Sequence, residues 1–168
     1  MSRVVTNSPR YQGLAYFATN AVGNESKEIE KYLRQFFDAL QSNVISIRPR
    51  LEAVSELFNL YRECSHPDWD GEGALPISAG TIQEAAKFLS ALPLTLRTPE
   101  IVPEPSGAIG FEWRFGPNAV FVASVHGTQE ISYAGLFGPG ITAYGTEAFA
   151  DSIPDTIVMN LQRLREAR

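Results

Sequence analysis

Hydrophobic side chains recur every three or four residues in the first part of the chain, which is the spacing of amphipathic helices. This spacing predicts a helix over residues 25–42 and a second over residues 49–64, which together would form a helical hairpin. Residues 1–24 are interrupted by Pro9 and Gly13 and carry no clear period. Two predictions remain for this segment: a short strand, or an arm that packs on another subunit.

The same spacing predicts a third helix over residues 77–91. Ser78 or Thr81 would cap it, because a hydroxyl oxygen can accept from an amide that the first turn leaves unpaired. Thr81 and Glu84 also have the spacing of a capping box, in which the glutamate reaches back to the cap.

The hydrophobic period changes to two near residue 109, which is typical of strands. Four strands are predicted over residues 109–115, 119–125, 129–137 and 141–144, with an edge strand over residues 100–103. The connections between them are too short for a parallel crossover, so the sheet must be antiparallel. A last helix is predicted from Ser152, with Asp155 near its start and arginines near its end.

These elements predict an α+β fold: three N-terminal helices, a four- or five-stranded antiparallel meander and one C-terminal helix. The 168 residues suit one domain, in which residues 65–168 supply a loop, a helix, the sheet and the last helix. A sheet with one apolar face needs a cover, and the helices are available for it. We expect them on the face that carries Phe111 and Trp113.

Composition and charge narrow the function classes. Hydrophobic residues make up 44% and charged residues 20%, as in ordinary globular domains. No apolar run approaches the roughly 20 residues of a membrane span, and the single cysteine, Cys64, excludes an internal disulfide, so a cytoplasmic protein is predicted. Residues 63–168 hold 13 acidic and 6 basic side chains, and this excess of acid disfavours nucleic acid as a partner. The acidic excess is explained either by solubility alone or by a basic protein partner.

The central loop is the first candidate site, because Asp68, Trp69 and Asp70 stand among glycines there. The carboxylates could accept loop amides while the indole plugs the core, or the loop could form a binding surface. A calcium loop would need a glutamate at its twelfth position, but Ala79 stands there counting from Asp68. No metal and no cofactor are therefore expected.

Glu112 and Arg114 are the second candidate site, on the strand face opposite Trp113. On an uncovered face they would form a solvated ion pair, whereas under a helix they would form a buried polar pair. Cys64, His66 and His126 do not make a complete nucleophilic or zinc set. Cys64 is also predicted at a helix C-terminus, where the helix dipole raises a thiol pKa. No phosphate-binding glycine motif is present.

A resemblance rests on the run WDGEGALPIS at residues 69–78, on Thr81-Ile82 and Phe88-Leu89, and on Glu112-Trp113-Arg114. With these motifs the chain resembles a loose group of small uncharacterised bacterial proteins with a Trp-Asp-Gly loop, a following helix and a sheet carrying Glu-Trp. The resemblance covers about residues 60–165 and brings no activity. It implies a bacterial protein. The association of similar proteins with toxin–antitoxin-like or mobile-element genes implies an antitoxin-like or regulatory subunit.

Three functions are therefore in competition. The first is a non-enzymatic protein-binding module using Asp68, Trp69, Asp70, Glu112 and Arg114. The second is a metal-dependent hydrolase or nuclease in which Asp68, Asp70 and Glu112 hold a divalent cation. The third is a nucleic-acid binder using the N-terminal basic residues Arg3, Arg10, Arg48 and Arg50. Self-association is compatible with all three.

Overall fold

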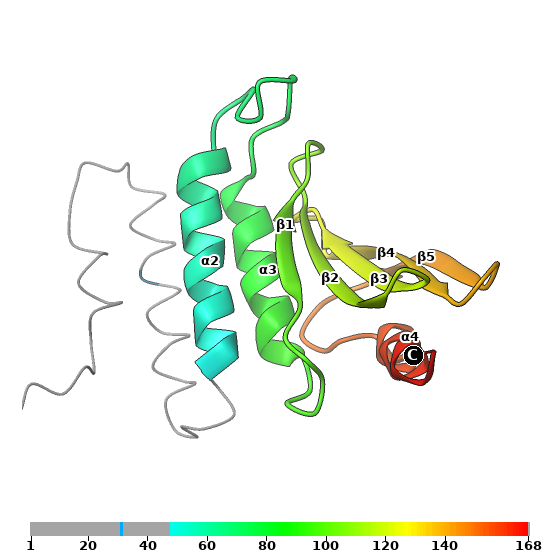
Figure 1. The fold of residues 1–168 in the computed structure, drawn as a ribbon. Coiled ribbons are helices and arrows are strands. Elements are labelled where there is room, and N and C mark those ends of the chain that lie inside the picture. Colours follow the sequence, from blue (N-terminus) through cyan, green and yellow to red (C-terminus); the bar gives the residue numbers. More distant parts are fainter. Residues whose placement is uncertain (1–30, 32–47, 168) are drawn as a thin grey trace, which may run out of the picture.

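The computed structural model describes Lys31 and residues 48–167, which form two helices, a sheet and a final helix (Figure 1). In chain order the elements are α2 (Arg48–Cys64), α3 (Ala79–Ala91), β1 (Glu100–Pro103), β2 (Ile109–Gly116), β3 (Ala119–Val125), β4 (Glu130–Phe137), β5 (Thr142–Ala148) and α4 (Asp155–Glu166). The predicted α+β class, the antiparallel sheet and the C-terminal helix are confirmed. Three helices before the sheet are not matched: the described part has two, and the helix predicted over residues 25–42 lies outside it, as do residues 1–24.

The sheet is a simple meander in which every strand pairs with its neighbour in sequence, in the order β1-β2-β3-β4-β5. The register joins Phe111 to Ala123 and Ala123 to Tyr133, so odd-numbered residues of these strands share one face. Even-numbered residues share the other face, where Glu112 stands opposite Val122 and Val122 opposite Ala134. The alternation read from the sequence thus separates two chemically different faces.

The odd-numbered face carries the core, as predicted. Phe88 of α3 stacks on Phe111 with ring centroids 4.4 Å apart, and its ring also meets Phe149 at 5.9 Å. α4 packs against β3 and β4, while α2 packs against α3 and β1. Figure 1 shows α2 and α3 side by side at one end of the sheet and α4 beneath its strands. None of the helices described in residues 48–167 combines the length and apolarity needed to cross a bilayer.

The ends of α3 are fixed by side chains. Ser78 is the N-cap and its Oγ accepts a hydrogen bond from the Thr81 amide at 3.0 Å, which confirms one of the two predicted caps. At the other end, Arg50 of α2 donates from Nη1 to the Leu92 carbonyl at 2.6 Å and from Nη2 to the Pro93 carbonyl at 3.3 Å. The guanidinium thus satisfies carbonyls that a helix end leaves unpaired.

Two boundaries differ from the prediction by three residues or more. The last helix begins at Asp155 rather than at Ser152, because Pro154 holds a ψ of 140° before the first turn and disfavours helical geometry in the residue that precedes it. The last strand extends to Ala148 instead of ending near residue 144. Gly145 allows this, since a Cβ there would lie 2.7 Å from the Tyr133 hydroxyl on the neighbouring strand.

Candidate functional site

The two aspartates of the central loop are occupied by the loop's own amides. Asp70 Oδ1 accepts from the Glu72 amide at 2.8 Å and from the Ala74 amide at 3.1 Å. Asp68, whose φ is +59°, accepts at Oδ1 from the Gly73 amide at 2.7 Å. The loop has no helix or strand, so the two carboxylates take the place of backbone carbonyls as acceptors for its amides. This is the structural role that was one of the two interpretations of the loop.

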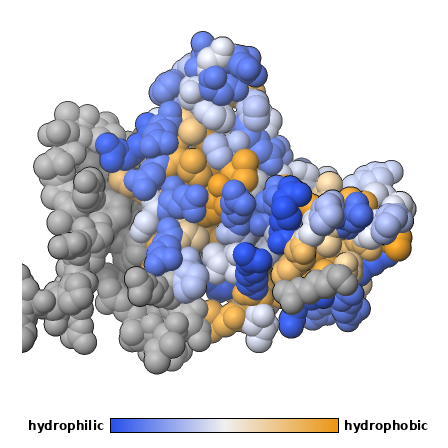
Figure 2. Space-filling view, in the orientation of Figure 1, coloured by the Kyte–Doolittle hydropathy of each residue, from blue (hydrophilic) through white to orange (hydrophobic). Residues whose placement is uncertain are grey.

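The loop is also fastened to the rest of the domain. Trp69 is half-buried against the core and donates from Nε1 to the Leu75 carbonyl at 2.9 Å. The Leu75 amide donates to the Pro105 carbonyl in the β1–β2 turn at 2.8 Å. Gly107 of that turn is pressed on the loop, because a Cβ there would lie 2.9 Å from the Pro76 carbonyl oxygen. Only the tip of the loop projects, and Figure 2 shows it as strongly hydrophilic.

The hydrogen bonds from loop amides to Asp70 make the stability of the fold depend on pH. The hydrogen bond from the Glu72 amide, and a second from Ala74, hold the pKa of Asp70 below its ordinary value of 3.8. A lowered folded-state pKa stabilises the fold above the unfolded pKa, and this contribution is lost as the pH falls through the folded value. Asp70→Asn should therefore be less stable than the wild type near neutral pH, and the difference should shrink below about pH 4.

Urea unfolding of both proteins between pH 7 and pH 2.5 measures this difference. Glu72→Gln is a suitable control, because it removes a neighbouring exposed carboxylate and leaves the amide contacts of Asp70 in place. A wild-type advantage that is independent of pH would show that the ionised carboxylate is not what stabilises the loop.

Glu112 and Arg114 form an ion pair on the uncovered face of the sheet. Glu112 Oε1 lies 2.6 Å from Arg114 Nη2 and accepts from Arg114 Nε at 2.8 Å. The Arg114 side chain is 57% exposed and the Glu112 side chain 21%. The solvated interpretation of this pair therefore holds, and such pairs add little stability. The pair does, however, fix the position of the Arg114 guanidinium on this face.

The loop carboxylates and Glu112 are not brought together. Within residues 48–167, no group of three or more His, Cys, Asp and Glu side chains is arranged to hold a metal ion. Asp68 and Asp70 use their hydrogen-bonded oxygens on the loop itself, and Glu112 is paired with Arg114. The hypothesis of a cation held by Asp68, Asp70 and Glu112 thus has no geometric support.

The other sequence candidates have local partners. Cys64 is buried, and burial followed by the nearby Glu63 charge raises its thiol pKa, the predicted direction. His66 Nδ1 lies 3.1 Å from the Pro67 carbonyl oxygen, and His126 Nε2 lies 3.4 Å from Ser132 Oγ. Neither histidine contacts the thiol, so the structure assembles no nucleophile–base pair from these three residues.

Arg50, one of the four arginines proposed to bind nucleic acid, is not available for such contacts. The residue is only 4% exposed, its guanidinium caps α3, and burial lowers its pKa. Arg3 and Arg10 lie outside the described residues, as does the side chain of Arg48. The described part therefore offers no cluster of cations from this set for phosphate contacts.

The uncovered face of the sheet, hereafter the open face, has an apolar centre. A shallow groove there is lined almost entirely by apolar surface, and five of its side chains, hereafter the apolar strip, are Val120, Val122, Ala134, Leu136 and Tyr144. Tyr144 is 82% exposed. No described helix packs on this face.

Carboxylates share the open face with the strip. Strand alternation and register place Glu100, Glu112 and Glu130 on the open face, and Glu104 joins them by accepting from Ser124 Oγ at 2.5 Å. Arg114 is the one basic residue of β1–β5 on this face. Glu112 and Arg114 were predicted from the sequence, but the strip was not, because its members look like core residues until the register assigns their face.

Glu84 was missed as well. The spacing with Thr81 predicted a capping box, but Glu84 instead accepts at Oε2 from the Gly127 amide in the β3–β4 turn. It is 6% exposed, on the same helix face as Thr81 and Phe88. An acid three and four residues from buried neighbours was the sequence signal for this position.

Comparisons with known proteins do not extend this picture: no family model, curated protein or solved structure matches the chain.

Proposed function

We propose that this chain is a protein-binding module that docks a basic, partly apolar segment of another protein on its open face. The observation that carries the proposal is an apolar strip on an acidic face. Its residues share the open face with four carboxylates and one guanidinium; they are Val120, Val122, Ala134, Leu136 and Tyr144. The structure describes no helix on this face. A partner would therefore supply both the apolar cover and the countercharge.

The strip suits a recognition surface for physical reasons. Interfaces combine an apolar centre with a polar rim, and an exposed tyrosine supplies large contact area at low entropic cost. Glu112 and Arg114 lie next to the strip, on the neighbouring strand and directly opposite Val122 and Val120. The excess of carboxylates would speed the approach of a basic partner and disfavour an acidic one.

The wider assignment follows from this surface and from the bacterial group that the sequence resembles. The module would act as an antitoxin-like or regulatory subunit in the cytoplasm, with no reaction of its own. Trp69 and the loop aspartates would serve it indirectly, by holding the β1–β2 turn next to the open face. The enzyme alternative is not favoured, because its three carboxylates are not grouped.

A pair of synthetic peptides tests the proposal. Both alternate apolar valine and tyrosine with charged residues, which are lysine and arginine in one peptide and glutamate in the other. In an amide NMR titration, the basic peptide should shift resonances of β3, β4 and β5, and its affinity should fall as salt is raised. The acidic peptide should bind at least about tenfold more weakly.

Two variants localise the binding. The double variant Val122→Thr with Tyr144→Thr places threonine, a residue that strands accept well, at both positions but removes much of the apolar strip. It should weaken binding of the basic peptide about tenfold or more. Met159→Thr on α4 is the matched control, because Met159 is an exposed apolar residue away from the sheet. Equal loss in both variants, or shifts confined to the helices, would contradict the proposed surface.

A further inference from the structure

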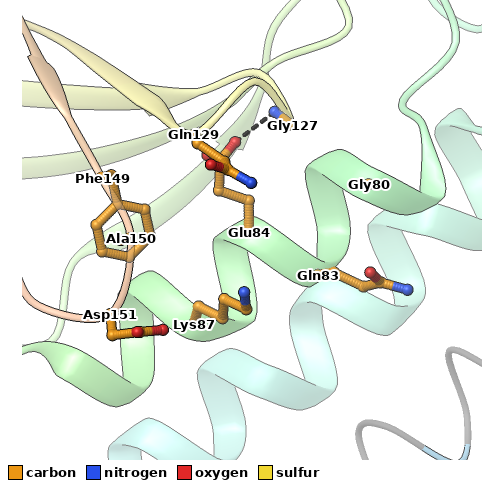
Figure 3. Close-up of a pocket in the computed structure, with 9 residues that line it drawn as sticks. All are labelled: Gly80, Gln83, Glu84, Lys87, Gly127, Gln129, Phe149, Ala150 and Asp151. Carbon is orange, nitrogen blue, oxygen red and sulfur yellow. Dashed lines mark hydrogen bonds between the residues drawn. The ribbon is translucent and has the colours of Figure 1, made fainter.

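A second, separate pocket lies on the helix side of the sheet, between α3, the β3–β4 turn and the segment that follows β5 (Figure 3). It has a volume of about 370 Å³ and its walls include Glu84, Lys87, Gly127, Gln129, Phe149 and Asp151. Figure 3 shows Glu84 rising from α3 toward Gly127, with Lys87 one turn further along the helix and Asp151 on the opposite segment. This combination of charges in a preformed hollow is what a ligand site requires.

One oxygen of Glu84 lacks a partner. Oε2 accepts from the Gly127 amide, but Oε1 is shielded from solvent and has no hydrogen-bond partner among the described residues. Leaving a buried charged acceptor unsatisfied is costly, so native proteins rarely do so without a reason. A donor supplied from the pocket would remove that cost.

The surrounding backbone holds the carboxylate in place. Gly127 has a φ of +77°, and a Cβ there would lie 2.9 Å from the Thr81 amide nitrogen, so the turn is pressed directly on the start of α3. Thr81 Oγ1 also donates to the His126 carbonyl at 3.3 Å. Glu84 is therefore held in place by α3 and by the β3–β4 turn. The position of its unpaired oxygen follows from how these two elements pack.

We infer that this pocket binds a small cation that donates hydrogen bonds, namely a primary ammonium or guanidinium group. Two carboxylates, Glu84 and Asp151, face one ammonium, Lys87, so a positive ligand is favoured over an anion. A nitrogen donor satisfies Oε1 through a charge-assisted hydrogen bond. Gln129 is exposed and lines the same pocket, so its side chain can turn outward to admit the donor.

The apolar wall sets the rest of the ligand. Phe149 and Ala150 are among the lining residues, and their apolar atoms suit an alkyl chain. A short alkyl amine or alkyl guanidine fits these features, whether it is a free metabolite or the end of a lysine or arginine side chain. The pocket lies on the opposite side of the sheet from the apolar strip, so this inference does not depend on the proposed docking surface.

Calorimetric or NMR titration of the whole chain with n-butylguanidinium and n-butylammonium tests the inference, with n-butanol as the uncharged analogue. Both cations should bind and shift the resonances of Glu84, Gly127 and Gln129, and butanol should not. Glu84→Gln retains an acceptor for the Gly127 amide but loses the charge, and should weaken both cations at least tenfold. Glu166→Gln, which removes one exposed carboxylate of α4, should leave the affinity unchanged.

Lys87→Met tests whether the cations occupy this pocket. Removing the ammonium that lines it should raise the affinity for both cations several-fold, whereas cations bound elsewhere on the protein would show no such gain. Tighter binding of blocked peptides containing arginine or lysine than of the free cations would identify a partner side chain as the ligand, and the reverse would identify a small molecule. The inference is overturned if neither cation binds at millimolar concentration, or if Glu84→Gln binds them as well as the wild type.

Discussion

Replacing Phe88 with alanine is expected to lower the free energy of unfolding by about 4 kcal/mol, the largest loss available from one side chain of α3. Phe88 is fully buried and its ring meets Phe111, Trp113 and Phe149, so it joins the helix layer to the sheet. Alanine would leave a cavity among rigid aromatic neighbours that cannot collapse into it. Urea unfolding followed by circular dichroism measures the change.

Two comparisons sharpen this measurement. Phe88→Leu should cost clearly less, because it keeps most of the buried volume. Tyr144→Ala removes a side chain that is 82% exposed and should change stability by no more than about 0.5 kcal/mol. A loss below about 1.5 kcal/mol for Phe88→Ala would show that α3 is not anchored through this ring.

Arg50→Ala is expected to cost about 3 kcal/mol, although arginine is normally a surface residue. The substitution removes charge-assisted donors to the Leu92 and Pro93 carbonyls, and it leaves the buried Leu92 carbonyl without this partner. Arg50→Lys should also destabilise, since a single ammonium cannot reproduce the planar fork that reaches two carbonyls. The same urea unfolding experiment measures both variants.

Arg62→Ala serves as the control for Arg50, because Arg62 is an exposed arginine in the last turn of the same helix. It should change stability by no more than about 0.5 kcal/mol. If the Arg50 and Arg62 variants were equally stable, the contact between Arg50 and the end of α3 would contribute nothing, and Arg50 would regain its place among candidate phosphate ligands.

The sheet was predictable from the sequence because its signal is local. A period of two in residues 109–115, a continuous apolar run in residues 119–125 and the tight turns predicted the strands, most of them with nearly correct bounds. The apolar Phe111 and Trp113 identified the covered face. The end of β5 was missed because residues 145–148 carry no large apolar side chain, and only their pairing with β4 identifies them as a strand. The two helices ahead of the sheet were likewise read from their apolar stripes.

The candidate sites were less predictable because they depend on contacts across the chain. The loop aspartates could be recognised from the sequence, but only the structure shows that Asp68 and Asp70 accept hydrogen bonds from loop amides. Arg50 looked like a free surface cation, and its burial depends on the end of α3, 42 residues away. Glu84 and the Gly127 amide are 43 residues apart, so no local pattern could pair them.

The meander has a consequence for how the chain reaches this structure. Because each strand pairs with the next one in sequence, every loop that the sheet must close is short, and little chain entropy is lost before a new pairing forms. Such local topologies fold faster than sheets built from distant strands. The docking of α2 and α3 is then the slower step, because Arg50 and Phe88 contact residues that are distant in the sequence.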